Sequence, residues 1–98
     1  MAAAGMQNID IAIKQMEPRP AAYVLFCHNG KFYTGSCRNL VERLKDHRAG
    51  RVSRTKNARP LLLAYHDYFE NYSDALRREH YLKSGSGRNL IKELLKSS

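Results

Sequence analysis

The sequence has few cysteines, few acidic residues and no long apolar run, and each shortage excludes a class of protein. Two cysteines, Cys27 and Cys37, could face each other across a hairpin, but they do not make a disulfide framework, and neither lies in a CxxC motif. We therefore expect reduced thiols in a cytoplasmic protein and no structural zinc site. No segment approaches the roughly 18 apolar residues of a membrane-spanning helix. The first residues also lack the charged start and apolar run of a secretory signal.

Acidic residues are outnumbered by basic ones, with nine Asp and Glu against 17 Lys and Arg and a net charge of +8. Because Lys and Arg that neutralise phosphates release counterions, this excess favours a polyanionic partner, and nucleic acid in particular. A merely soluble basic protein is the alternative that charge alone leaves open. With 98 residues and 43% hydrophobic content, the chain is one globular domain with a modest core.

The beginning of the chain predicts a peripheral segment followed by a β-hairpin. Residues 1–20 are rich in Ala and end in Pro18-Arg19-Pro20, so we expect the domain itself to span residues 21–98. Residues 23–27 are typical of a strand, and residues 31–36 form the expected return strand. The Asn29-Gly30 pair between them predicts a type I′ turn, in which both central residues need positive φ.

The remainder predicts one more strand and three helices. Asn39 and Glu42 resemble a capping box for a helix that runs to about Ala49, where Gly50 can end it. Residues 61–69 read as a third strand, apolar enough at its start for a central position. Ser73 is the expected cap of a second helix through Lys83, and a short third helix follows the break at residues 84–87. The expected fold is therefore an α+β domain of order ββαβαα, with a three-stranded sheet and helices packed on it.

Five side chains of complementary chemistry follow one another along these elements. They are two phenols, a guanidinium, an imidazole and a carboxylate: Tyr23, Tyr33, Arg43, His47 and Glu79. Both tyrosines lie on the expected hairpin, and Arg43 and His47 are one helical turn apart. Hydrolysis of a phosphodiester needs an activated water, charge stabilisation on the phosphate and help for the leaving oxygen, and these residue types can supply all three.

Over about residues 21–95 the sequence resembles the GIY-YIG nuclease superfamily, in particular its small stand-alone, excision-nuclease-like subgroup. The first motif is Ala21-Ala22-Tyr23, which keeps only the tyrosine, and the second is Tyr33-Thr34-Gly35. The resemblance continues through residues 39–47, 59–61 and 73–79. It implies that Tyr23, Tyr33, Arg43, His47 and Glu79 form the active site. Asn89 is a looser match to an asparagine near the site in some members, and Ser36 stands where some relatives have a lysine.

The chemistry of the site agrees with that implied role. Glu79 is the expected ligand of one Mg²⁺ or Mn²⁺ ion, because magnesium takes one or two carboxylates and otherwise keeps waters and phosphate oxygens. Arg43 suits the pentavalent phosphate through its bidentate geometry and permanent charge. Tyr23 or Tyr33 could take a proton from water if positive charge lies nearby. His47 could position the water or relay its proton.

Each of these residues also has an ordinary structural explanation. Tyrosines on a hairpin usually pack across strands, and an arginine or histidine on a helix usually faces solvent. Glu79 could form a routine helix salt bridge with Lys83. Only the conjunction of all five favours a nuclease site over these alternatives.

A basic loop follows the first expected helix and carries Arg51, Arg54, Lys56 and Arg59. Their spacing fits no single helix face, so the loop is predicted to be a flexible arm that contacts DNA phosphates without reading sequence. We therefore expect a metal-dependent DNA endonuclease that acts in DNA repair or processing. One alternative is a nucleic-acid-binding module with little or no hydrolytic activity. Another is a domain of an assembly in which a protein partner supplies specificity.

Overall fold

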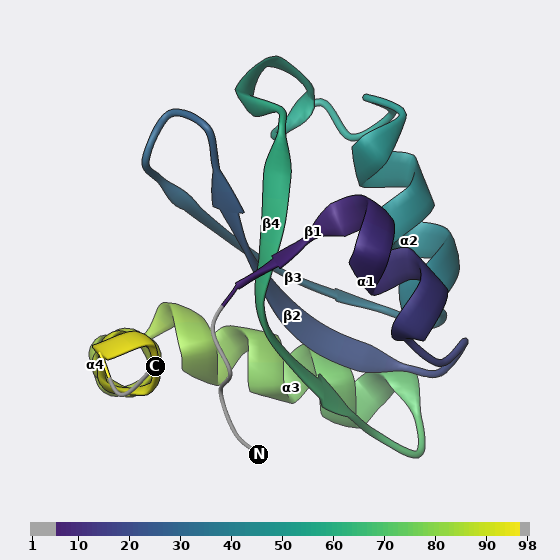
Figure 1. The fold of residues 1–98 in the computed structure, drawn as a ribbon. Coiled ribbons are helices and arrows are strands. Elements are labelled where there is room, and N and C mark those ends of the chain that lie inside the picture. Colours follow the sequence, from purple (N-terminus) through teal and green to yellow (C-terminus); the bar gives the residue numbers. More distant parts are fainter. Residues whose placement is uncertain (1–5, 97–98) are drawn as a thin grey trace.

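The computed structural model describes residues 6–96 as a single antiparallel sheet with helices on both faces. The four strands are β1 (Gln7–Asn8), β2 (Ala21–Cys27), β3 (Phe32–Cys37) and β4 (Leu61–Tyr68), and they lie in the order β1-β4-β2-β3. Figure 1 shows α1 and α2 on one side of this sheet and α3 on the other, with α4 crossing the end of α3. The α+β class is therefore as expected.

The prediction of three strands is wrong, because the sheet gains a short edge strand from the segment before the hairpin. Gln7 and Asn8 pair with Leu63 and Leu62 of β4. The helix α1 (Ile9–Gln15) follows directly, and the Asn8 side chain caps it by accepting a hydrogen bond from the backbone N–H of Asp10. Because Ile9 and Ala12 are buried in the core, part of the segment expected at the periphery contributes to the sheet and its packing. The observed order is βαββαβαα.

The hairpin between β2 and β3 forms as predicted, but its turn is of another type. Gly30 has φ +84°, whereas no other residue than glycine in residues 6–96 has a positive φ, so Asn29 cannot occupy a type I′ turn. The N–H of Gly30 donates to the carbonyl of Cys27, and the N–H of Cys27 donates to the carbonyl of Lys31. These bonds describe a three-residue loop that ends in a glycine bulge.

The two cysteines lie at opposite ends of this hairpin. Cys37 pairs with Ala21 at the open end, whereas Cys27 adjoins the turn, so they do not face each other. Both are buried free thiols, and burial raises the pKa of each, that of Cys37 to about 11. Such thiols are unreactive packing groups.

Strand β2 is buried on both faces and separates two clusters of side chains. Tyr23 and Leu25 point into the larger cluster beneath α1 and α2, whereas Ala22 and Val24 point into the smaller cluster beneath α3 and α4. Strand β4 lies between β1 and β2, which confirms the central position expected from its apolar start. Strand β3 is therefore an edge strand, and its side chains alternate between the two faces of the sheet.

The helices begin and end at residues with clear capping roles. In α2 (Leu40–Arg48) the Asn39 side chain accepts from the N–H of Glu42, as predicted, and Gly50 follows with φ +79°. The cap of α3 (Tyr72–Lys83) is Asn71 and not Ser73. After Ser84 the chain restarts at once as α4 (Gly85–Lys96), which is as long as α3. None of the described helices is long and apolar enough to cross a membrane.

Candidate active site

The phenol of Tyr23 lies directly over Gly35 on the neighbouring strand. The two residues are paired in the β2–β3 register, and a Cβ atom on Gly35 would come within 2.7 Å of the Tyr23 hydroxyl. A side chain at this position would therefore displace the phenol. This close approach explains why the Tyr33-Thr34-Gly35 motif ends in glycine.

A buried chain of hydrogen bonds connects Tyr23 to the loop after α2. The Tyr23 hydroxyl lies 2.8 Å from Nε2 of His47, and Nδ1 of His47 lies 2.8 Å from Oγ1 of Thr55. The Thr55 hydroxyl also lies 3.5 Å from the carbonyl oxygen of Val52. All three side chains of the network are fully buried. Its donors and acceptors are satisfied without water, which fixes the orientation of the imidazole.

The direction of these hydrogen bonds follows from the acceptor at the far end. The carbonyl of Val52 can only accept, so the Thr55 hydroxyl donates to it and accepts from Nδ1–H of His47. Nε2 of His47 is then free to accept the hydroxyl proton of Tyr23. Burial, and secondly the nearby charge of Arg43, lower the pKa of His47 to about 4. The imidazole is therefore neutral at pH 7, which leaves Nε2 as a hydrogen-bond acceptor for Tyr23.

Tyr33 and Arg43 complete this cluster. The Tyr33 ring lies edge-on to His47, with ring centroids 5.2 Å apart, and 6.3 Å from the Tyr23 ring. Burial raises the pKa of Tyr23 well above its usual value, and the adjacent Arg43 guanidinium acts in the opposite direction. Burial alone would lower the pKa of Arg43, but its interactions with the phenols of Tyr23 and Tyr33 outweigh this and raise it. Four of the five predicted residues thus meet.

Glu79 lies on the face of the edge strand β3 opposite to the tyrosine cluster. Its Oε1 accepts a hydrogen bond of 2.5 Å from the Ser36 hydroxyl, and its Oε2 lies 2.5 Å from Nζ of Lys83. The side chain of Glu79 is only 14% exposed. Burial raises the pKa of this carboxyl, but Lys83 and then Ser36 outweigh burial and lower it. The helix salt bridge considered from the sequence is therefore present, and the residue remains ionised.

The groups around Glu79 fit a hard divalent cation only if Lys83 moves. Within residues 6–96 no three His, Cys, Asp or Glu side chains gather as a metal cluster, so a cation at Glu79 would have at most two protein ligands of these types. Magnesium tolerates that, because it keeps most of its waters. The ammonium of Lys83 donates to Oε2 of Glu79, but the Lys83 side chain is half exposed and can adopt another rotamer.

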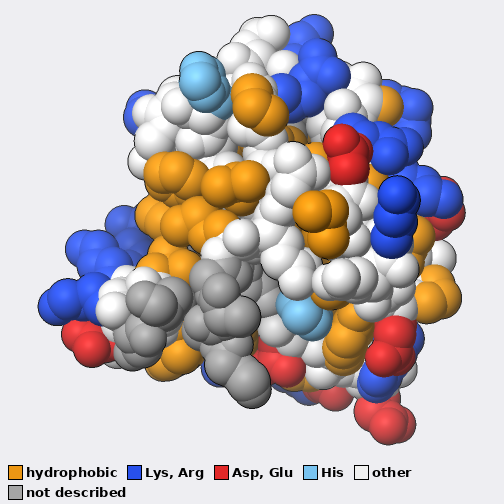
Figure 2. Space-filling view, in the orientation of Figure 1, with side chains coloured by type: hydrophobic (Ala, Val, Ile, Leu, Met, Phe, Trp, Pro, Cys, Tyr) orange, Lys and Arg blue, Asp and Glu red, His pale blue; other side chains and the backbone are white. Residues whose placement is uncertain are grey.

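The basic loop is folded and not a flexible arm. Its residues Lys56–Ala58 form a 3₁₀ turn, η1, and Val52 and Thr55 are buried. Arg51 pairs with Asp46 at 2.9 Å, and Arg59 donates to the carbonyls of Lys56 and Arg48. In Figure 2, Lys and Arg side chains gather over α2 and this loop.

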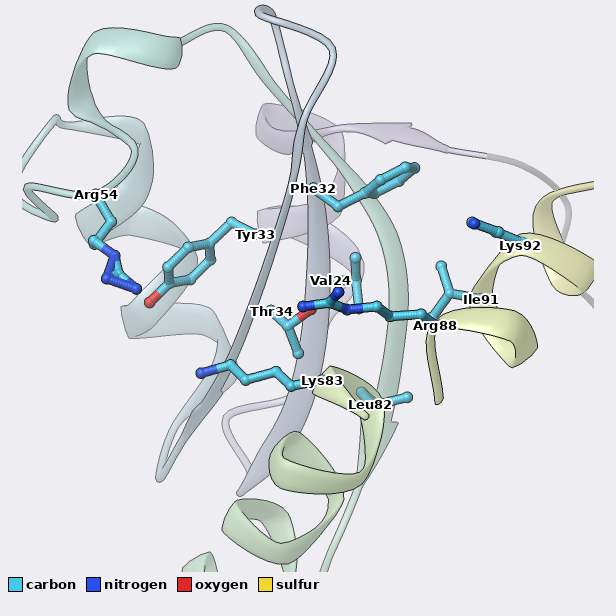
Figure 3. Close-up of a pocket in the computed structure, with 10 residues that line it drawn as sticks. All are labelled: Val24, Phe32, Tyr33, Thr34, Arg54, Leu82, Lys83, Arg88, Ile91 and Lys92. Atoms are coloured by element: carbon cyan, nitrogen blue, oxygen red, sulfur yellow. The ribbon is translucent and has the colours of Figure 1, made fainter. Parts of the chain in front are cut away.

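Arg54 differs from its neighbours because it points into a cavity beside Tyr33. The cavity has a volume of about 480 Å³ and runs along β3 toward α3 and α4. Figure 3 shows Arg54 and Lys83 directed toward the end of the cavity where the Tyr33 hydroxyl lies, with Arg88 and Lys92 on the α4 side. The cavity connects the two halves of the site, since Lys83 also holds Glu79.

Several of these residues were not found from the sequence. Thr55 has no sequence signature, because its role depends on the loop folding back onto His47. For Arg88 and Lys92 the sequence did carry a pattern, since a spacing of four places two basic residues on one face of a helix. Asn89 lies on α4 beside a separate hollow that includes Met6 and Phe32, not in the tyrosine cluster.

The fold and the cluster define the class of protein: a small α+β domain with phenol, imidazole and guanidinium groups gathered at the edge strand of its sheet. A family model described as the GIY-YIG catalytic domain matches residues 20–92. The chain therefore belongs to the GIY-YIG family, a nuclease superfamily, which confirms the resemblance drawn from the sequence.

Known relatives are small proteins of similar length. A UPF0213 protein of Staphylococcus haemolyticus is 35% identical over 71 residues, covering 71% of this chain and 87% of the relative. A UPF0213 protein of Limosilactobacillus reuteri is 37% identical over 76 residues, covering 74% and 79%. The solution structure of a UPF0213 protein from Bacillus halodurans is 27% identical, with a TM-score of 0.48 over 76% of this chain and 83% of that one.

Proposed function

We propose that this protein is a metal-dependent endonuclease that hydrolyses DNA phosphodiester bonds. The observation that carries the proposal is the buried Tyr23–His47–Thr55 chain, which gives one phenol of the tyrosine pair a built-in proton acceptor. Any buried phenol needs a hydrogen-bond partner, but a histidine held with Nε2 as the acceptor is a partner to which the proton can also be transferred. The family supports the class of reaction, and the geometry supports the roles proposed for the residues.

Tyr23 acts as a relay and not as a standing phenolate. Because burial raises the pKa of its hydroxyl, an ionised Tyr23 is disfavoured before the reaction starts. The hydroxyl is closed to solvent in the structure, so it would accept a proton from the attacking water once substrate binding admits that water, and would pass its own proton to Nε2 of His47. Thr55 holds the imidazole in the required tautomer. This assigns the general base to the Tyr23–His47 pair and leaves Tyr33 to bind the phosphate.

Arg43 and Glu79 act on the charge of the phosphate. The guanidinium of Arg43 is positioned by both phenols and is permanently charged, so it can stabilise the pentavalent phosphate. Glu79 would hold a Mg²⁺ or Mn²⁺ ion, which when bound would stabilise the leaving oxygen. Lys83 neutralises the carboxylate of Glu79 until it is displaced.

DNA binding is assigned to the basic cavity beside Tyr33 and to the basic loop. The cavity is lined by Arg54, Lys83, Arg88 and Lys92, and by no acidic side chain of residues 6–96. Arg51, Lys56 and Arg59 extend the positive surface over the loop. These side chains would contact backbone phosphates, which carry no sequence information. We therefore infer a role in DNA repair or processing in which DNA structure or a protein partner sets the target.

The direct test is a cleavage assay with branched, nicked, single-stranded and duplex DNA, with and without Mg²⁺ or Mn²⁺. Cleavage of at least one substrate that depends on the divalent ion and disappears in Tyr23→Phe supports the proposal. Cleavage that is unchanged in Tyr23→Phe, or that persists fully in a chelator, contradicts it.

A second candidate function is a DNA-binding module with little hydrolysis. The observation that favours it is the engagement of both Glu79 oxygens by Ser36 and Lys83. If Lys83 does not leave, no cation can reach the carboxylate. Tight DNA binding without cleavage of any of the four substrates, in either metal, would decide for this alternative.

A further inference from the structure

The cavity beside Tyr33 has an apolar floor inside its ring of positive charge. Val24, Leu82 and Ile91 come from β2, α3 and α4 and are almost fully buried, at 1%, 1% and 6% exposed, whereas Phe32 on β3 stands at the rim, 46% exposed. Figure 3 shows the Phe32 ring on the opposite side of the Thr34 position from Tyr33, with the α4 side chains facing it. The floor is part of the core, but a surface that only binds phosphates has no need of an exposed aromatic ring at its rim.

Charge and shape together restrict what can occupy this cavity. Its lining carries four cations and no acidic side chain of residues 6–96, and although Lys83 is paired with Glu79, the surplus of positive charge favours a polyanion. The exposed Phe32 ring at the rim favours a flat apolar face attached to that polyanion. Paired bases in a continuous duplex keep their faces stacked on one another, whereas an unpaired base can turn its face to a protein.

We propose that the cavity is a subsite for an unpaired nucleobase next to the phosphate held by Tyr33 and Arg43. The base stacks against the exposed ring of Phe32, and Arg88 and Lys92 contact the phosphates on its α4 side. The inference rests on the proposed function and narrows its substrate class to DNA with a single-stranded overhang, flap or gap.

Binding to three labelled probes tests the subsite without any cleavage. The full-length protein, in a chelator, is titrated with a blunt duplex, the same duplex carrying a short overhang, and that overhang built from abasic nucleotides. The abasic overhang keeps every phosphate and removes only the bases. Because stacking on an aromatic side chain contributes to affinity for each base, the normal overhang should bind at least about fivefold more tightly than the abasic one.

Variants assign this difference to the cavity. Phe32→Ala should abolish the preference for the normal overhang, and Phe32→Trp should restore it. Tyr81→Ala is the matched control, because Tyr81 is a similarly exposed aromatic, 41% accessible, outside the cavity. Arg88→Gln with Lys92→Gln should weaken binding of both overhangs equally, whereas Lys14→Gln on α1, on the other side of the sheet, should change neither.

Equal affinity for normal and abasic overhangs overturns the proposal, as does a preference that Phe32→Ala leaves intact. Because the readout is binding in a chelator, its failure is distinct from failure of the nuclease proposal. If the protein cuts DNA but binds both overhangs equally, only this inference is wrong. If the protein prefers the normal overhang but does not cut DNA, only the proposed nuclease activity is wrong.

Discussion

The hydroxyl of Tyr23 lies 2.8 Å from Nε2 of His47, and neither side chain is accessible to solvent. Tyr23 comes from β2 and His47 from the last turn of α2, so the bond ties the sheet to the helix that covers it. The same bond points the phenol over Gly35 toward the edge strand. One contact thus contributes to the fold and to the chemistry proposed at the edge.

Tyr23→Phe should lower the cleavage rate by about 10²-fold or more, the effect typical of losing a positioned proton-transfer group. It removes one oxygen and keeps the ring, but it leaves Nε2 of His47 buried without a donor. We therefore also expect a loss of roughly 1–3 kcal/mol in the free energy of unfolding. Tyr65→Phe is the control, since its hydroxyl accepts from Arg78 on the far side of the sheet. An equal loss of rate in both variants would argue against the relay.

The buried imidazole predicts how stability depends on pH. The pKa of His47 is about 4 in the folded protein and about 6.5 in an unfolded chain. As the pH falls from 6.5 to 4, the unfolded chain binds a proton that folded His47 does not, so the free energy of unfolding should fall. Over the whole window this group contributes roughly 3 kcal/mol.

Denaturant unfolding at several pH values measures this contribution. Burial also lowers the pKa of His66, which adds a dependence of the same sign, so the difference between parent and variant is the informative quantity. His47→Gln should flatten the curve between pH 6.5 and 4. His80→Gln, which changes an exposed histidine on α3, should leave the His47 contribution in place. A curve that stays as steep in His47→Gln would show that another group carries the dependence.

The pairing of Glu79 with Lys83 predicts opposite effects of two substitutions on metal binding. Glu79→Gln should remove cleavage and weaken Mg²⁺ binding while the fold stays intact, because the amide is nearly isosteric. Lys83→Met should tighten Mg²⁺ binding, because the ammonium no longer competes for Oε2. Calorimetric titration of both variants with Mg²⁺ checks this, with Glu42→Gln on α2 as a control. Unchanged Mg²⁺ affinity in Glu79→Gln would remove this carboxylate as the ligand.

Arg43→Ala should separate cleavage from binding. Because the guanidinium lies among the phenols of the site, its loss should lower the cleavage rate by about 10²-fold, and DNA affinity should fall far less. Arg48→Ala is the matched control on the same helix, where the arginine is exposed and pairs with Asp10. Equal losses of rate and affinity in Arg43→Ala would favour the binding module.

Local patterns in the sequence predicted the elements whose causes are local. The Asn39 cap, the β2–β3 hairpin and the central β4 strand follow from capping chemistry, turn residues and apolar content. Strand β1 was missed because two residues carry no periodicity, and only pairing with β4 makes them a strand. The Asn29-Gly30 turn was misassigned because a glycine bulge has nearly the same sequence signature as a type I′ turn.

The same distinction holds for the site. Residue type and order predicted Tyr23, Tyr33, Arg43 and His47, and these four do meet. The sequence could not show that Glu79 lies on the face of β3 opposite to these four residues, because that depends on the packing of α3 against the sheet. Nor could it show that Thr55 fixes His47, since this contact requires the loop after α2 to fold.

Two arginines of the basic loop have different surroundings in the structure. Arg54 faces the cavity with Tyr33, whereas Arg51 is paired with Asp46 at the surface. Arg54→Ala should therefore weaken DNA binding about uniformly across sequences and reduce the slope of log affinity against log salt by roughly one unit. Arg51→Ala removes the same charge from a paired position and should change the slope less. Affinities at several salt concentrations compare the two. If Arg51→Ala reduces the slope as much as Arg54→Ala does, the DNA follows the outside of the loop and not the cavity.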